Sequence, residues 1–287
     1  MTSNHSNSTQ TEHPGKDQTF ASAHSFYTYD IHGTDTDYKD QIQMHSLFSM
    51  MQEAASLDAS VYGWGAEHLD KLDTCWLLLR MSVRMARRPS WLEKITVETW
   101  SRGTERLYFL RDFILYDESG MKIGVGSSVW ILANRSTHRP VRPSALEEIT
   151  RKAADPVSSM TSNPPKINPK ADSAWMSANL TSKNTIVKFA DFSEIDRNLH
   201  VNNTRYVAWC LDAAHNRSLN QGDILGIDII YNAEIHFGEK VVLFFEEEDS
   251  QIKNGCEENS RCLHVDGYVA EGSKIAFSAV LYTQDAF

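Results

Sequence analysis

The order of secondary-structure patterns in this chain occurs twice, and this repetition limits the possible folds more than any other feature. In the first half, an extended stretch at 26–31 precedes a helical pattern at 44–61. In the second half, an extended stretch at 184–190 precedes a helical pattern at 202–219. Four strand-like runs follow each helix: 75–86, 94–102, 106–116 and 122–134, then 227–237, 240–248, 261–270 and 274–283. An internal duplication of about 120 residues is the simplest explanation.

Each repeat predicts a unit of the α+β class. Apolar residues at 44, 47, 48 and 51 follow the i, i+3, i+4, i+7 spacing of a helix with one buried face. A helix of about 17 residues is about 25 Å long, enough for a sheet to curl around it. We therefore expect two tandem units, each an antiparallel sheet wrapped around a long helix. The predicted ranges are a disordered polar tail at 1–23, units at 24–135 and 181–287, and a proline-rich linker at 136–180.

The segment before the second helix carries the residues best suited to chemistry. It reads Asp196-Arg197-Asn198-Leu199-His200-Val201-Asn202-Asn203. If the segment is extended, Asp196, Asn198 and His200 point to one side, beside the unpaired N–H groups and positive dipole end of the helix. Such a site can stabilise a carbonyl oxygen that becomes negative, which predicts an enzyme. Taken alone, the same residues also fit ordinary turn chemistry.

Composition excludes several other classes of protein. The net charge is −10, which argues against general nucleic-acid binding, although residues 80–142 carry twelve Lys or Arg against six Asp or Glu. Four cysteines without regular spacing (Cys75, Cys210, Cys256 and Cys262) argue against a disulfide framework or a zinc site. No apolar run reaches the roughly 20 residues of a membrane span, and no targeting pattern is present, so we expect a cytoplasmic protein.

The repeat and the Asn198–Asn203 segment together resemble the acyl-[acyl carrier protein] thioesterases, which are built from two tandem hotdog units. The likeness covers about residues 24–284. Further matching segments are Cys75-Trp76, Val129-Trp130-Ile131-Leu132 running into Arg139-Pro140-Val141-Arg142-Pro143, and Tyr231-Asn232-Ala233-Glu234 in the strand expected after the second helix.

This resemblance implies hydrolysis of fatty acyl-acyl carrier protein thioesters, as part of fatty acid biosynthesis. It gives the catalytic positions to Asp196, Asn198, His200 and Glu234. Plant members carry a cysteine after this glutamate, and Ile235 stands there instead, so we expect attack by an activated water. Glu234 is assigned as the base and His200 as the group that orients water or thioester, with the reverse assignment left open. Asn198 would hold the water or the carbonyl, and Asp196 would orient its neighbours.

The resemblance also implies an acyl pocket in the first unit, because that unit lacks the Asn-x-His pair in its own loop at 37–43. The residues expected to line it are Met44, Leu47, Phe48, Met51, Trp64, Met81 and Met85. An acidic carrier protein would dock on basic residues, for which the candidates are Arg80, Arg84, Arg87, Arg88, Arg135, Arg139 and Arg142. We expect no cofactor and no metal; His32, His45 and His68 lack metal-ligand spacing.

Two other functions remain open on the sequence alone. One is a hotdog hydratase or dehydratase acting on enoyl thioesters, although those enzymes typically place a proline between the Asn and the His, where this chain has Leu199. The other is a non-catalytic acyl-thioester binding protein. The sequence also leaves open the length and saturation of the acyl chain, and whether the substrate is a thioester of acyl carrier protein or of coenzyme A. It does not decide whether the protein is a monomer of tandem units or a homodimer.

Overall fold

The structure is a computed structural model that describes residues 23–137, 139–141, 154–179, 182–216, 224–248, 262–269 and 273–283. The predicted tail, apart from its last residue, and Arg142 lie outside these ranges. The N-terminal unit contains β1 (His24–Asp30), the short 3₁₀ turn η1 (Gly33–Asp35), α1 (Met44–Val61), α2 (Ala66–Lys71), β2 (Thr74–Met85), β3 (Lys94–Glu105), β4 (Tyr108–Asp117) and β5 (Lys122–Asn134). The rest contains α4 (Ser173–Ala178), β6 (Thr185–Phe189), η2 (Phe192–Glu194), α5 (Asn203–Asn216), β7 (Ile224–Tyr231), β8 (Lys240–Glu248), β9 (Cys262–Val269) and β10 (Lys274–Thr283).

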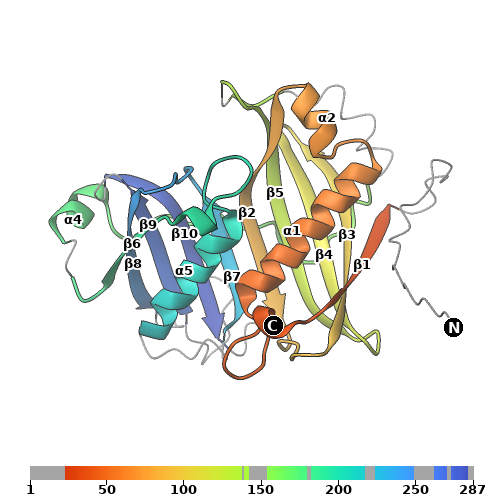
Figure 1. Ribbon diagram of the computed structural model, residues 1–287, viewed down its shortest axis with the longest axis horizontal. Helices are drawn as coiled ribbons and strands as arrows, with labels where there is room; N and C mark the ends of the chain where they lie inside the picture. Colours follow the sequence, from red (N-terminus) through yellow and green to blue (C-terminus); the bar gives the residue numbers. More distant parts are fainter. Residues whose placement is uncertain are drawn as a thin grey trace, which may run out of the picture.

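The strands of the described ranges form a single antiparallel sheet in the order β1-β3-β4-β5-β2-β7-β10-β9-β8-β6. Read outward from the centre, β2-β5-β4-β3-β1 in one unit corresponds to β7-β10-β9-β8-β6 in the other. The two units therefore share one strand order, as a duplication predicts. The long helices α1 and α5 lie against the same face of the sheet and contact each other (Figure 1). This arrangement confirms the predicted α+β class with a sheet wrapped around a long helix in each unit.

Helix α1 forms where the apolar spacing predicts it. Its residues Met44, Leu47, Phe48 and Met51 are at most 2% exposed and belong to the main hydrophobic core. The sheet approaches the helix closely at Gly126 of β5, where an added Cβ would lie 2.4 Å from Met51 Cε. A glycine here allows a close contact between helix and sheet that any larger residue would disturb.

The two units are joined by backbone pairing of β2 with β7, from Arg80 opposite Ile230 to Arg84 opposite Gly226. A buried ion pair reinforces this junction. Two guanidinium nitrogens of Arg84 donate to the two carboxylate oxygens of Asp228, each at 2.9 Å. The Arg84 guanidinium also lies 4.1 Å from the ring centre of Tyr282, whose hydroxyl donates to Asp228. This bidentate geometry fixes the position of one unit relative to the other.

The segment 154–179, which makes up most of the described part of the predicted linker, contacts both units. The amide of Ser159 donates to Asp112 on β4, and the amide of Lys170 donates to Asp266 on β9. Asp112 and its neighbour Phe113 point to opposite faces of the sheet because side chains alternate along a strand. Phe113 belongs to the core beneath the helices, so the linker crosses the other face of the sheet.

The strand predicted at 227–237 ends earlier than expected. Strand β7 stops at Tyr231, because the next two amides, of Asn232 and Ala233, both donate to the carbonyl of Ala276. Two residues opposite one residue is the geometry of a bulge, which turns the chain away from its partner strand. Glu234 consequently lies in the loop between β7 and β8, not within a strand.

The Arg84–Asp228 pair supplies the first prediction. Asp228→Asn removes the carboxylate charge that pairs with the guanidinium of Arg84, whose side chain is 16% exposed. Removing one member of a buried ion pair lowers the free energy of unfolding by about 3–5 kcal/mol. Urea denaturation followed by circular dichroism measures this loss.

The matched control is Asp30→Asn. Asp30 pairs with Lys94 across the surface, where both side chains are more than half exposed. Loss of an exposed pair changes the free energy of unfolding by at most about 1 kcal/mol. Equal losses in the two variants would contradict a structural role for the buried pair.

Candidate active site

The segment 196–200 forms a tight turn, so the predicted extended conformation is wrong. The amide of Asp196 donates to the carbonyl of His200 at 2.8 Å, and the amide of Leu199 donates to the carbonyl of Asp196 at 3.0 Å. Leu199 has φ of +66° and its side chain is 74% exposed. A side chain oxygen of Asp196 accepts from the amide of Asn198 at 2.7 Å. Asp196 thus holds the turn that presents Asn198 and His200.

The N-terminal unit contains the same turn with different side chains. The amide of Asp37 donates to the carbonyl of Gln41, and the amide of Asp40 donates to the carbonyl of Asp37. Asp40 has φ of +58°, and the bridge between Thr36 and Ile42 repeats the bridge between Ile195 and Val201. Asp37 therefore corresponds to Asp196, and Gln41 to His200.

A buried arginine fills this first turn. A nitrogen of Arg88 donates to Asp37 and to the side chain of Gln41, each at 2.8 Å. The side chains of Arg88 and Asp37 are 2% and 4% exposed. The amide of Ile42 donates to the carbonyl of Pro89, as the amide of Val201 does to that of Ile235. By this correspondence Arg88 takes the place that Glu234 takes in the second unit.

In the second unit the turn meets the loop that follows β7. His200 Nε2 lies 3.3 Å from a carboxylate oxygen of Glu234, and both side chains are partly exposed, by 19% and 32%. The ring of His236 contacts the edge of the His200 ring at a centroid distance of 4.8 Å. The structure thus brings His200 and Glu234 together as predicted. His236 was missed, although it follows Glu234 by two residues.

These residues line a cavity of about 420 Å³. Its walls include all four predicted catalytic residues, together with Trp76, Asn203, Tyr206 and His236. An adjoining cavity of about 300 Å³ is also lined by His200 and Glu234, together with Cys75 and Arg135. Solvent and a substrate can therefore reach the His200–Glu234 pair.

Helix α5 begins at the edge of this cavity. The side chain oxygen of Asn202 accepts from the amide of Thr204 at 2.9 Å, which is the geometry of an N-cap. Asn203, the first residue of the helix, lines the cavity. The positive end of the helix dipole is thereby directed toward the site.

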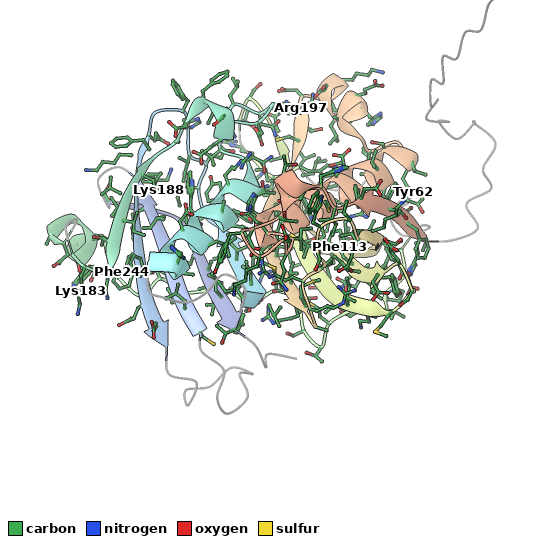
Figure 2. All side chains as sticks on the ribbon, turned by 60° about the horizontal axis from the view of Figure 1, so that its bottom comes forward. Tyr62, Phe113, Lys183, Lys188, Arg197 and Phe244 are labelled. Atoms are coloured by element: carbon green, nitrogen blue, oxygen red, sulfur yellow. The ribbon has the colours of Figure 1, made fainter. Side chains whose placement is uncertain are left out.

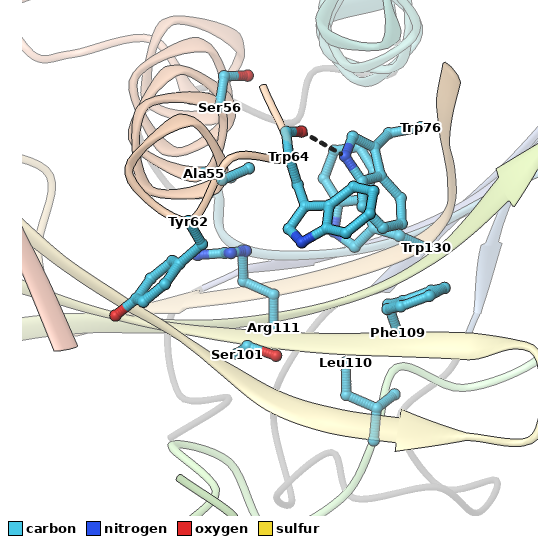
Figure 3. A pocket seen from close by; sticks show the side chains of 11 residues that line it. Ala55, Ser56, Tyr62, Trp64, Trp76, Ser101, Phe109, Leu110, Arg111 and Trp130 are labelled. Carbon is cyan, nitrogen blue, oxygen red and sulfur yellow. Dashed lines mark hydrogen bonds between the residues drawn. The ribbon is translucent and has the colours of Figure 1, made fainter. Parts of the chain in front are cut away.

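A separate apolar pocket of about 110 Å³ lies in the N-terminal unit, between α1 and the sheet (Figure 3). Its walls are formed by Ala55, Ser56, Ala59, Tyr62, Trp64, Trp76, Ser101, Phe109, Leu110, Arg111 and Trp130. Trp76 lines both this pocket and the cavity at His200. Its indole nitrogen donates to the carbonyl of Trp64, and its ring packs edge-on against Phe109. The two spaces are therefore adjacent, with Trp76 between them.

Only Trp64 of the seven predicted pocket residues lines this apolar pocket. The others, Met44, Leu47, Phe48, Met51, Met81 and Met85, lie in the hydrophobic core. The aromatic residues Trp76, Phe109 and Trp130 were missed. They lie on three different strands, so no local spacing marks them as one group.

Most of the predicted docking arginines make structural contacts. Arg80 donates to the carbonyl of Pro164, Arg84 pairs with Asp228, Arg87 pairs with Glu93 and Asp117, and Arg88 pairs with Asp37. Buried Arg88 cannot touch a partner. Arg139 is exposed, and Arg135 is partly exposed at the cavity beside Glu234.

Asp70 of α2 links the two units next to this cavity. One carboxylate oxygen lies 2.7 Å from Arg135, and the other lies 2.8 Å from Arg197 of the turn at 196–200. Figure 2 labels Arg197 beside the N-terminal unit. Two ion pairs of Asp70 therefore connect the turn at 196–200 to Arg135, which directly follows β5.

Cysteine chemistry is poorly supported at this site. Cys210 is fully buried on α5, and burial raises the pKa of its thiol. Cys75 lines the adjoining cavity. Burial raises the pKa of its thiol, the positive charge of Arg135 lowers this pKa, and the negative charge of Glu234 raises it. Ile235 is 0% exposed in the core. None of these positions, all within the described ranges, has the features of an activated nucleophile.

Comparison with known proteins gives consistent matches. Residues 24–152 match the family model of the acyl-ACP thioesterase N-terminal domain, and residues 177–283 match that of the C-terminal domain. An acyl-ACP thioesterase structure from Bacteroides thetaiotaomicron is 25% identical, with a TM-score of 0.75 covering 92% of this chain and 100% of that one. The 12:0-ACP thioesterase from Umbellularia californica is 20% identical, with a TM-score of 0.74 covering 91% of this chain and 93% of that one. At this identity the likeness shows a shared fold.

Plant proteins give the sequence relatives. Oleoyl-acyl carrier protein thioesterase 2 of Arabidopsis thaliana is 24% identical over 67% of this chain and 54% of its own length. A palmitoyl-acyl carrier protein thioesterase of Gossypium hirsutum is 26% identical over 75% of this chain and 52% of its own length. This chain spans about half the length of these curated relatives.

Among the helices of the described ranges, none is both long and apolar enough to cross a bilayer.

The environment of the cysteines predicts an order of alkylation. Cys75 lies at a cavity but has a raised thiol pKa, so iodoacetamide should label it slowly at pH 7 and faster at pH 9. Buried Cys210 and Cys262 should stay unlabelled until the protein unfolds. Mass spectrometry of the alkylated peptides measures each site, with protein in urea as the control. Labelling of Cys75 at pH 7 as fast as a thiol in a short peptide would contradict this description of the site.

Proposed function

The chain belongs to the acyl-ACP thioesterase family, and from that premise we propose that it hydrolyses fatty acyl thioesters of acyl carrier protein. The products are a free fatty acid and the thiol of the carrier. The observation that carries the proposal is the His200–Glu234 pair, 3.3 Å apart, in a cavity that shares Trp76 with an apolar pocket. The His200–Glu234 pair is suited to activating a water molecule. The apolar pocket is suited to binding an alkyl chain.

Hydrolysis begins with a water held between the turn at 196–200 and Glu234. The carboxylate of Glu234 takes a proton from this water while its oxygen attacks the thioester carbon. His200 orients the water or the thioester through its ring nitrogen. The tetrahedral intermediate then collapses, the carbon–sulfur bond breaks, and the proton passes to the leaving thiolate. Atoms and charge balance with water as the only co-reactant.

The negative oxygen of the intermediate needs hydrogen-bond donors. The side chain amide of Asn198 and the backbone N–H of Asn203 are the proposed donors, since both residues line the cavity. The amides of Thr204 and Arg205 already donate to Asn202. Asp196 acts indirectly, because its carboxylate holds the amide of Asn198 and so fixes the turn. This division gives each residue of the predicted set one task.

The alkyl chain enters the apolar pocket past Trp76. Aromatic side chains form much of the lining of this pocket. Burial of methylene groups there stabilises the bound chain by about 0.8 kcal/mol each. The N-terminal unit thus binds the chain and the C-terminal unit carries out the reaction. The carrier docks on the surface beside Arg135 and Arg139, next to the opening at Cys75 and Glu234. We further propose a cytoplasmic protein that acts in fatty acid biosynthesis.

Loss of the proposed base or its partner should abolish most of the activity. Glu234→Gln and His200→Ala should each lower kcat about 10²-fold or more, the range expected for removal of a general base. Fatty acid release from an acyl carrier protein thioester, measured by mass spectrometry, gives kcat. Cys210→Ser is the control and should stay near the wild-type rate. Normal kcat in Glu234→Gln would place the base elsewhere, and hydration of an enoyl thioester without thiol release would indicate a lyase.

The docking proposal predicts a change specific to the protein-bound substrate. Arg135→Glu/Arg139→Glu should raise KM for the acyl carrier protein thioester about 10-fold at low salt, because steering of the acidic carrier is lost. A small acyl thioester should show a much smaller rise in KM, limited to the loss of the Arg135–Asp70 contact beside the turn at 196–200. Lys94→Glu/Lys122→Glu makes the same change of net charge at the opposite end of the N-terminal sheet. Equal effects on both substrates, or in both double variants, would rule out docking at Arg135 and Arg139.

A further inference from the structure

The proposed catalytic pair lies beside a second histidine that hydrolysis does not require. One ligand atom each from His200, Glu234 and His236 lies within 4.8 Å of the others. Two imidazoles and one carboxylate form a common zinc-binding set in proteins. We infer that His200, Glu234 and His236 bind a Zn²⁺ ion, and that the bound ion stops thioester hydrolysis.

The distances fit a zinc ion with small side-chain movements. Donor atoms that lie about 2.0–2.1 Å from a tetrahedral zinc are about 3.3 Å from each other. His200 Nε2 and the Glu234 carboxylate oxygen are already 3.3 Å apart. His236 must approach further, and its exposed side chain is able to rotate. Its backbone is fixed, because the amide of His236 donates to Glu239 at 2.7 Å.

The three ligands leave one coordination position toward solvent. All three residues line the cavity of about 420 Å³ and also the adjoining cavity of about 300 Å³. A metal ion can therefore enter, and a water molecule can complete a four-coordinate site. The sequence alone did not predict this site, since its ligands come from two loops that meet only through folding.

Zinc binding uses the same lone pairs that the proposed reaction needs. A carboxylate bound to zinc is a weaker base, and an imidazole bound through Nε2 can no longer hold a water there. The inhibitory part of this inference rests on the proposed function, whereas the binding part does not. Magnesium and calcium prefer oxygen ligands, so they should not replace zinc at a site with two imidazoles.

Calorimetric titration of the untagged full chain with ZnCl₂ tests binding directly. The wild-type protein should show one site that His236→Ala weakens at least about 10-fold, since loss of even an outer-shell partner costs 10–100-fold in metal affinity. His215→Ala, an exposed histidine at the end of α5, is the matched control and should bind as the wild type does. Magnesium chloride should give no saturable heat. Equal zinc affinity in wild type and His236→Ala would overturn the inference.

Fatty acid release with and without zinc tests inhibition. Mass spectrometry of the fatty acid is the appropriate measurement, because zinc binds the thiol product and would disturb a thiol assay. Each variant is compared with its own zinc-free rate. Zinc should inhibit wild type and His215→Ala at concentrations at least 10-fold below those needed for His236→Ala, and EDTA should restore the rate.

The possible outcomes separate the two proposals. Zinc that binds at the three residues but leaves turnover unchanged, or raises it, would overturn the inhibitory role. Absence of hydrolysis in zinc-free wild-type protein would count against the proposed function instead. In that case the calorimetric comparison of wild type with His236→Ala would still decide whether the three residues bind zinc.

Discussion

The antiparallel pairing of β2 with β7 is the contact on which the rest of the molecule depends. It joins two five-stranded halves into one sheet and places α1 and α5 against each other on a single face. The start of β2 carries Trp76, which borders the apolar pocket, and the loop after β7 carries Glu234. Pairing these two strands therefore brings the apolar pocket of one unit beside the His200–Glu234 pair of the other.

The two units keep the same backbone turn and use it differently. In both, an aspartate accepts from the backbone amide two residues later, and the residue after that has a positive φ. The turn of the second unit presents His200 and Asn198 to a cavity. The turn of the first unit is closed by Arg88, which binds Asp37 and Gln41. The backbone of the turn is thus the same in both units. The side chains determine whether the turn borders an open cavity or encloses a buried ion pair.

The sequence predicted the features that depend on local spacing. The periodic residues of α1 gave its bounds and its buried face, and the repeat of elements gave the class of fold. The position of Glu234 next to His200 came only from resemblance, and its place in a loop depends on the distant carbonyl of Ala276. The ion pairs of Arg84 and Arg88 could not be predicted, because their partners, Asp228 and Asp37, are 144 and 51 residues away in the sequence. Spacing along a strand shows which face a residue occupies, but not which spaces the core leaves unfilled.

Closure of the first turn by a buried cation has an evolutionary consequence. To form the same set of side chains in the first unit, the chain would have to replace Arg88 with an acid, Lys39 with an asparagine and Gln41 with a histidine. Replacing Arg88 first would leave Asp37 beside another buried carboxylate, and loss of a buried ion partner alone costs about 3–5 kcal/mol. That is a large part of the roughly 5–15 kcal/mol by which a typical domain is stable. The difference between the two turns is therefore far easier to keep than to reverse by single substitutions.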